Sequence, residues 1–322
     1  MSAMRLAALL GCAAVAAFGM SLLYGVGGFT LSGSAAAQRT ILFEVRLPRA
    51  LLGFMVGGTL GLTGAVLQGY LRNPLAEPGI MGISGGAALG AVIAIHSGIA
   101  QTFALALPIA GLTGAALATM ALAILAGRGI GSVTLILAGV AVSSLAGALT
   151  SLALNLAPNP FAASEMLYWL MGSLTDRSLT QVWLAAPLMA IGCAVLALTA
   201  RDLDALSLGE DAAQNLGVNP RRLRLMVVTG TALAVGAATA VCGAISFVGL
   251  MVPHLLRPFT TGEPGRLLLP SFLGGAALVL FADVALRAIS PLGDLRLGVL
   301  TALIGAPFFL WLVLRGRSEM AP

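Results

Sequence analysis

Long stretches of this chain contain no charged side chain. They are 6–38, 50–71, 78–127, 129–164, 178–200, 225–256, 267–282 and 297–314. A helix needs about 20 apolar residues to cross the hydrocarbon core of a bilayer, so 78–127 is long enough for two crossings. In lipid every backbone polar group must be bonded within its own segment, which a helix achieves alone. A β-barrel would alternate apolar and polar residues, whereas these stretches are apolar on all sides.

The stretches predict an all-α polytopic membrane protein with about ten transmembrane helices in a single domain, 1–322. Gly243 leaves room for a turn within 225–256, and the apolar run continues past Arg257 toward Thr261. The expected helices lie near 6–28, 48–69, 79–98, 104–126, 133–155, 181–200, 224–243, 247–261, 268–287 and 297–314.

An even number of crossings places both termini on one side of the membrane, and the arginines indicate which side. With a cytoplasmic N-terminus the inside arginines are Arg5, Arg72, Arg128, Arg201, Arg221, Arg222, Arg224, Arg257, Arg266, Arg315 and Arg317. The outside ones are Arg39, Arg46, Arg49, Arg177, Arg287 and Arg296. Cytoplasmic loops carry the excess of basic residues, so the larger inside set favours an N-in, C-in topology.

The first apolar stretch follows Arg5, and Leu9-Leu10-Gly11-Cys12 has the form of a lipoprotein cleavage box. About six apolar residues precede the cysteine, fewer than the roughly 7–15 of a signal-peptide core, so a retained helix is expected. The three cysteines match no metal or redox spacing and are interpreted as small apolar residues: Cys12, Cys193 and Cys242.

The chain has no lysine; all 17 Lys+Arg positions are arginine. A phosphate-binding-loop lysine and a Schiff-base lysine are therefore excluded, so another subunit must perform any ATP hydrolysis. Because His96 and His254 lack the companions of a nucleophile or a metal site, we expect no catalytic residue and no metal ligand. A proton- or sodium-coupled carrier needs ionisable groups deep in the membrane, and His96, Glu165 and Asp283 fall near helix ends.

A polar segment, 201–224, interrupts the apolar pattern. Ser207 and Glu210 have the spacing of a capping box, and Leu216-Gly217 has the form of a helix stop. Asn219 followed by Pro220 predicts the start of a second helix. The pattern by itself fits a solvated loop with two helix caps, or a docking element for a cytoplasmic partner.

Two short segments suggest an internal duplication. Val56-Gly57-Gly58-Thr59-Leu60-Gly61-Leu62 and Val228-Thr229-Gly230-Thr231-Ala232-Leu233-Ala234 begin helices that would run in opposite directions. Inverted repeats of this kind are common in transporters, although so short a Gly/Ala-rich match also arises by chance.

Several motifs follow one another along the chain. They are Arg46-Leu47-Pro48-Arg49, Gly64-Ala65-Val66-Leu67-Gln68-Gly69, Arg72-Asn73-Pro74-Leu75-Ala76-Glu77-Pro78, Gly82-Ile83-Ser84-Gly85-Gly86-Ala87, Leu208-Gly209-Glu210-Asp211-Ala212, Phe247-Val248-Gly249-Leu250 with Pro253-His254, Ala282-Asp283, Gly298-Val299-Leu300-Thr301-Ala302 and Gly305-Ala306-Pro307-Phe308. In this order they resemble the permease subunits of ATP-binding cassette importers for iron chelates, haem and cobalamin, and the resemblance covers nearly the whole chain.

The resemblance implies a type II importer permease in the bacterial inner membrane, paired with a second copy of itself. Two ATP-binding cassette ATPase subunits would bind below it and a periplasmic substrate-binding protein above it. This chain would then bind no cofactor, since the partner subunit uses ATP and Mg, and it would bind no nucleic acid.

The resemblance also assigns site residues. Arg46, Arg49 and Arg287 would contact acidic residues of the binding protein, as guanidinium groups bind carboxylates bidentately. The residues themselves also allow Arg46 and Arg49 to anchor a helix end, and Arg287 to pair with Asp283 four residues before it. The positions expected to couple to the ATPase are Ser207, Leu208, Gly209, Glu210, Asp211, Leu216, Gly217 and Arg221.

The resemblance implies a translocation pathway along the fifth helix, lined by Val140, Ser143, Ser144 and Thr150, although such hydroxyls also bond their own helix backbone. Structural roles are implied for Gln68, Asn73, Pro74, Pro253 and His254. The segment 156–180, with Tyr168 and Trp169, is expected to form a short helix on the outer face.

The expected function is the import of a bulky metal chelate, a ferric siderophore or haem, by the permease half of an ATP-driven importer. Two alternatives remain from the sequence: the same machinery importing cobalamin, and a self-sufficient secondary carrier. The sequence does not name the cargo.

Overall fold

The computed structural model describes residues 3–25, 34–127, 132–290 and 295–319, and the described chain is helical in almost every segment. The α-helices are α1 (Ala3–Leu23), α2 (Ala35–Thr40), α3 (Leu47–Tyr70), α4 (Ile83–His96), α5 (Ala106–Ala126), α6 (Ser132–Asn155), α7 (Pro160–Leu170), α8 (Leu179–Ala197), α9 (Ala200–Leu206), α10 (Glu210–Asn215), α11 (Pro220–Cys242), α12 (Val248–Leu256), α13 (Pro264–Ile289) and α14 (Leu297–Glu319). Short 3-10 turns lie at Pro78–Met81, Ile99–Gln101 and Arg257–Phe259, and a π-helix, Ile41–Arg46, joins α2 to α3.

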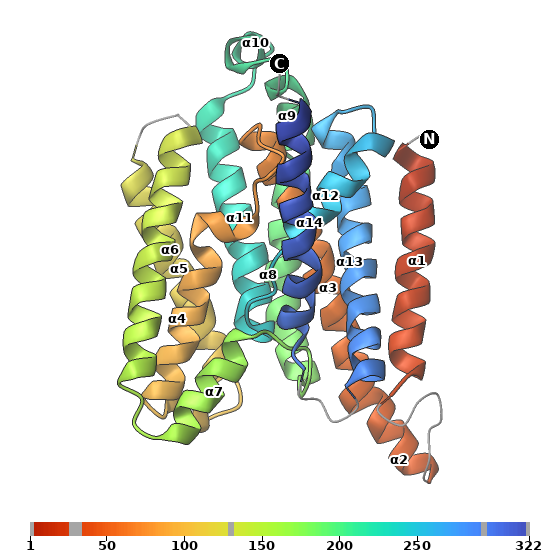
Figure 1. The fold of residues 1–322 in the computed structure, drawn as a ribbon, viewed down its shortest axis with the longest axis vertical. Helices are drawn as coiled ribbons and strands as arrows, with labels where there is room; N and C mark the ends of the chain where they lie inside the picture. Colours follow the sequence, from red (N-terminus) through yellow and green to blue (C-terminus); the bar gives the residue numbers. More distant parts are fainter. Residues whose placement is uncertain (1–2, 26–33, 128–131, 291–294, 320–322) are drawn as a thin grey trace.

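The long helices form one bundle, with α9 and α10 at one end and α2 and α7 at the other (Figure 1). The two ends of the chain lie at the end that carries α9 and α10 (Figure 1). This arrangement agrees with the even number of crossings inferred from the charge pattern.

The centre of the bundle is built from α3, α11 and α13. In an apolar stretch of 18 residues, 83% of the residues are buried in the continuous helix Ala35–Tyr70, which contains α3, and 72% are buried in each of α11 and α13. The corresponding share is 22–28% in α1, α5, α6 and α8. Glycines let the central helices touch: a methyl group on Gly57 would overlap the carbonyl of Gly275, and one on Gly61 would overlap that of Ser271. Such close backbone approach stabilises helix pairs in lipid, where no hydrophobic force drives association.

Each of the ten predicted spans overlaps a helix, but their lengths differ. Seven helices among the described residues are long and apolar enough to cross a membrane. The predicted span 247–261 is wrong in extent, because α12 has only 9 residues. At about 1.5 Å per residue it covers roughly half of a 30 Å hydrocarbon core. The 14 residues of α4 also fall short of a full crossing.

Both short helices follow a long helix and a connection that contains no α-helix. After α3 the chain runs through 71–82 before α4 begins, and after α11 it runs through 243–247 before α12 begins. The two long helices, α3 and α11, run in opposite directions in the bundle, and so do the two short helices, α4 and α12 (Figure 1). This pattern agrees with the inverted duplication that the sequence suggested.

Candidate functional site

Three arginines expected at the outer surface meet in a buried cluster around Asp283. Arg49 binds this carboxylate through two nitrogens, with Nε–Oδ1 at 2.9 Å and Nη2–Oδ1 at 2.8 Å. Arg287 contributes an Nη2–Oδ2 contact of 3.0 Å from one turn further along α13. The side chains of Asp283, Arg287 and Arg49 are 1%, 5% and 12% exposed.

The cluster also holds the end of α1. Arg287 donates to the carbonyls of Ser21 and Tyr24 and to the Ser21 hydroxyl. Arg46 donates to the carbonyls of Leu22 and Leu23, at 3.0 and 2.7 Å. These are last-turn carbonyls, which lack partners within their own helix. The arginines therefore join α1, α3 and α13, as the anchoring interpretation of the sequence allowed, and docking to a binding protein stays a prediction.

An outer pocket of about 280 Å³ leads to this cluster. Arg49 lines it together with Glu44, Thr175, Asp176 and Arg177. Burial lowers the pKa of Arg177, but a guanidinium stays charged at any physiological pH. The pocket thus combines two cationic and two anionic side chains at the outer end of the bundle.

The short helix predicted within 156–180 is present as α7, and its place on the outer face stays a prediction. Asn159 is its N-cap, and the Oδ1 of Asn159 accepts a hydrogen bond from Ala162 N at 2.9 Å. Tyr168 is exposed and lies under the guanidinium of Arg296, 4.9 Å from the ring centre. Trp169 instead packs into the bundle beside Ala91 and Met166, so its expected interfacial position is not observed.

The polar segment 201–224 forms α9, α10 and the start of α11, and its first cap differs from the prediction. Ser207 ends α9 rather than starting α10, because its hydroxyl donates to the carbonyl of Asp204 at 2.6 Å. The N-cap of α10 is Gly209, at φ 110°, and Glu210 is the first helical residue. The predicted capping box is therefore wrong.

The other local signals in this segment are confirmed. Leu216 is the C-cap of α10 and Gly217 follows at φ 92°. Asn219 caps α11 by accepting from the backbone N–H groups of Arg221 and Arg222, with Pro220 in the first turn. Glu210 pairs with Arg72 at 3.1 Å, and Leu208 and Leu216 are exposed apolar side chains. Coupling of this surface to an ATPase stays a prediction.

The residues expected to line a pathway lie on an open side of α6. Val140 is 49% exposed, Ser144 is exposed, and Ser143 and Thr150 are partly buried. Ser143 donates to the carbonyl of Gly79 at 3.4 Å, which ties α6 to the connection before α4.

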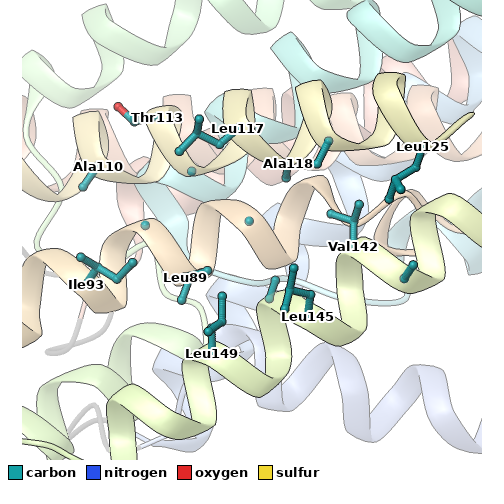
Figure 2. A pocket seen from close by; sticks show the side chains of 16 residues that line it. Leu89, Ile93, Ala110, Thr113, Leu117, Ala118, Leu125, Val142, Leu145 and Leu149 are labelled. Atoms are coloured by element: carbon teal, nitrogen blue, oxygen red, sulfur yellow. The ribbon is translucent and has the colours of Figure 1, made fainter. Parts of the chain in front are cut away.

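A cavity of about 530 Å³ lies between α4, α5 and α6, and none of these four residues lines it. Its walls are apolar, with Leu89, Leu117 and Leu145 turned toward one another from the three helices (Figure 2). A second cavity of about 510 Å³ lies between the end of α7, the 243–247 connection and α14.

The motif residue Gln68 forms a buried polar centre, and the other motif residues lie around it. Gln68 is 1% exposed; its Nε2 donates to the carbonyl of Leu250 at 3.1 Å, and its Oε1 accepts from Arg257 Nη2 at 3.1 Å. Asn73 shapes the turn after α3 by accepting from Leu75 N at 2.9 Å, with Pro74 between them. On α12, Pro253 is buried, and the ring of His254 packs edge-on against Phe308 of α14.

Glu77 belongs to this centre and was missed as a site residue. Its Oε1 accepts from Phe247 N at 2.7 Å, across 170 positions of sequence. A signal was available, since Glu77 borders the longest charge-free stretch and stands beside Pro78. The sequence could not indicate its partner, because the contact joins two separate connections.

Comparisons with known proteins extend over the whole bundle. The sequence pattern of the FecCD transport family matches residues 6–315. The chain is 37% identical over 286 residues to the vitamin B12 import system permease protein BtuC of Klebsiella pneumoniae subsp. pneumoniae, covering 88% of this chain and 86% of that one. It is 39% identical over 284 residues to the hemin transport system permease protein HmuU of Yersinia pestis, covering 87% and 84%. A solved metal-chelate-type ABC transporter in an inward-facing conformation superposes with a TM-score of 0.85 at 31% identity, covering 97% of this chain and 99% of that one.

Proposed function

The chain belongs to the FecCD transport family, and we propose that it forms the membrane pathway by which an ATP-driven importer passes a bulky metal chelate to the cytoplasm. It is a multi-pass permease of the iron-chelate, haem and cobalamin importer family, located in the bacterial inner membrane and built as a type II importer permease. In this family ATP is hydrolysed by a separate subunit, as the absence of lysine requires of this chain.

The assembly we propose contains a second copy of this chain, two ATPase subunits and a periplasmic binding protein. The open faces of α6 and α14 support pairing with the second copy, because each exposes large apolar side chains, among them Leu137, Leu303 and Leu310. The α9–α10 pair supports ATPase docking, since it projects beyond one end of the bundle (Figure 1). The arginine cluster at the opposite end supports docking of the binding protein.

The cargo we propose is a ferric siderophore or haem. Cobalamin is the second candidate. Of the two relatives reported above, the one named for hemin is 39% identical to this chain and the one named for vitamin B12 is 37% identical. The small and hydroxyl side chains on α6 suit either cargo, since they offer a wide lining that holds no ligand tightly.

The single observation that supports this function most strongly is the likeness to a metal-chelate-type transporter over 97% of the chain. The cargo is tested by purifying the binding protein that docks on this permease and titrating it with haem, ferrichrome and cyanocobalamin. Tight binding of haem or ferrichrome alone is expected. Binding of cyanocobalamin alone would move the assignment to the second candidate, and binding of none would contradict the chelate proposal.

A further inference from the structure

The connection between α3 and α4 holds the start of α12. Phe247, the N-cap of α12, lies at φ 67°, a left-handed conformation that is strained for a residue other than glycine. Its N–H donates to Glu77 Oε1 at 2.7 Å. A bond this short to a carboxylate is charge-assisted and stronger than a neutral one, so Glu77 holds Phe247 in its strained position.

Gln68, in the last turn of α3, ties α12 to the helix that leads into this connection. Its amide bonds Leu250 in the first turn of α12 and Arg257 just beyond the last. The connection also packs directly on α12, because a methyl group on Gly249 would overlap the ring of Pro78. Through Glu77 and Pro78, a displacement of the 71–82 connection therefore acts on the first turn of α12.

The other end of this connection reaches α10. Arg72 also lies in the left-handed region, at φ 50°, and pairs with Glu210 at 3.1 Å. About half of each side chain in this pair is exposed, so the contact contributes little to stability and remains free to rearrange.

Beyond Phe247 the contacts continue to α14. The Phe247 side chain lies directly against the backbone of α14 at Gly305, because a methyl group on Gly305 would overlap that side chain. Ala244 and Ser246, just before Phe247, line the second cavity together with Val299, Ala302 and Ala306 of α14. The position of Phe247 therefore sets one wall of that cavity.

We propose that Glu77 is a positioning residue for transport, which carries a displacement of α10 through 71–82 to Phe247 and so to the cavity wall beside α14. This inference rests on the proposed function, in which an ATPase subunit moves α10.

The test compares transport per ATP hydrolysed in the full complex in proteoliposomes, with haem, ferrichrome and cyanocobalamin as probes. Glu77→Ala is expected to lower this ratio about tenfold, the size of one charge-assisted hydrogen bond, while ATPase association is retained. Glu77→Gln should restore most of the ratio, because its amide oxygen can still accept from Phe247 N. The control Glu263→Ala removes an exposed carboxylate paired with Arg266 and should leave the ratio unchanged.

An unchanged ratio in Glu77→Ala overturns the proposal, and so does an equal loss in Glu77→Gln and Glu77→Ala. If Glu77→Ala does not assemble, Arg72→Ala decides, since its exposed side chain can be removed without harm to folding. A lowered ratio then supports the link to α10, and a wild-type ratio overturns it. Failure of the wild-type complex to import any probe would instead contradict the proposed function.

Discussion

Arg49 of α3 and Asp283 of α13 form a bidentate ion pair across 234 positions of sequence, at the outer end of the bundle. Asp283 is also the counter-ion of Arg287, so two guanidinium groups share one buried carboxylate. Removing one partner of a buried pair is costly, because the remaining charges keep their desolvation penalty. The carboxylate is therefore the most sensitive point of the junction between α1, α3 and α13.

Replacing this carboxylate should destabilise the subunit. Asp283→Asn is expected to cost about 3–5 kcal/mol of folding free energy, because Arg49 and Arg287 stay buried without a counter-charge. The measurement is the thermal unfolding midpoint of the purified subunit in one detergent. Glu263→Gln, which breaks the exposed pair with Arg266, is the control and should cost less than about 1 kcal/mol. Equal midpoints for the two variants would refute a stabilising role of Asp283.

Docking of the binding protein should depend on Arg49. Arg49→Gln is expected to weaken binding-protein affinity about tenfold or more, because an acidic partner loses a bidentate, charge-assisted contact. Affinity is measured with the subunit in nanodiscs, and retained ATPase association verifies the fold. Arg39→Gln changes an exposed outer arginine of α2 and is the matched control. The same affinity for Arg49→Gln, Arg39→Gln and wild type would assign Arg49 to the internal junction alone.

ATPase coupling should depend on the first turn of α10. Exchanging both Glu210 and Asp211 for alanine removes the acidic pair and the contact with Arg72, so ATP-driven uptake should fall and the ATPase should dissociate more readily. Gln214→Ala alters an exposed residue of the same helix and serves as control. Unchanged uptake in proteoliposomes containing the double variant would contradict the docking interpretation of 201–224.

The open side of α6 should be sensitive to bulk. Ser144→Trp fills the expected pathway and should abolish uptake while leaving ATP hydrolysis in place. Leu145→Trp places the same side chain one residue on, in the apolar cavity between α4, α5 and α6, and should be tolerated. If the second variant blocks uptake and the first does not, the pathway follows the cavity wall instead.

Features fixed by neighbouring residues could be predicted from the sequence. Charge-free runs located the helices, and Asn219 with Pro220 marked the start of α11, because a cap acts within a few positions of chain. Ser34, which accepts from Ala37 N at 3.3 Å, offered the same kind of signal for α2. The predicted second span began at 48, so that signal was overlooked.

Features fixed by distant contacts could not be predicted. The fit of Ser207 to a capping box was equally compatible with the end of α9, and only the position of the Asp204 carbonyl decides between the two. The start of α12 at Val248 agrees with the turn that Gly243 indicated, but the sequence could not show that Glu77, from another part of the chain, holds Phe247 at its positive φ just before this start. Likewise, sequence spacing could suggest the pairing of Asp283 with Arg287 on one helix, but not with Arg49.

We propose that this chain transports only as the membrane subunit of an ATP-driven importer. It is tested most directly by reconstituting the chain in liposomes with and without the ATPase subunit, and measuring uptake of the chelate delivered by its binding protein. Uptake is expected only when the ATPase and internal ATP are both present. Uptake by the chain alone, driven by a proton or sodium gradient, would contradict the account.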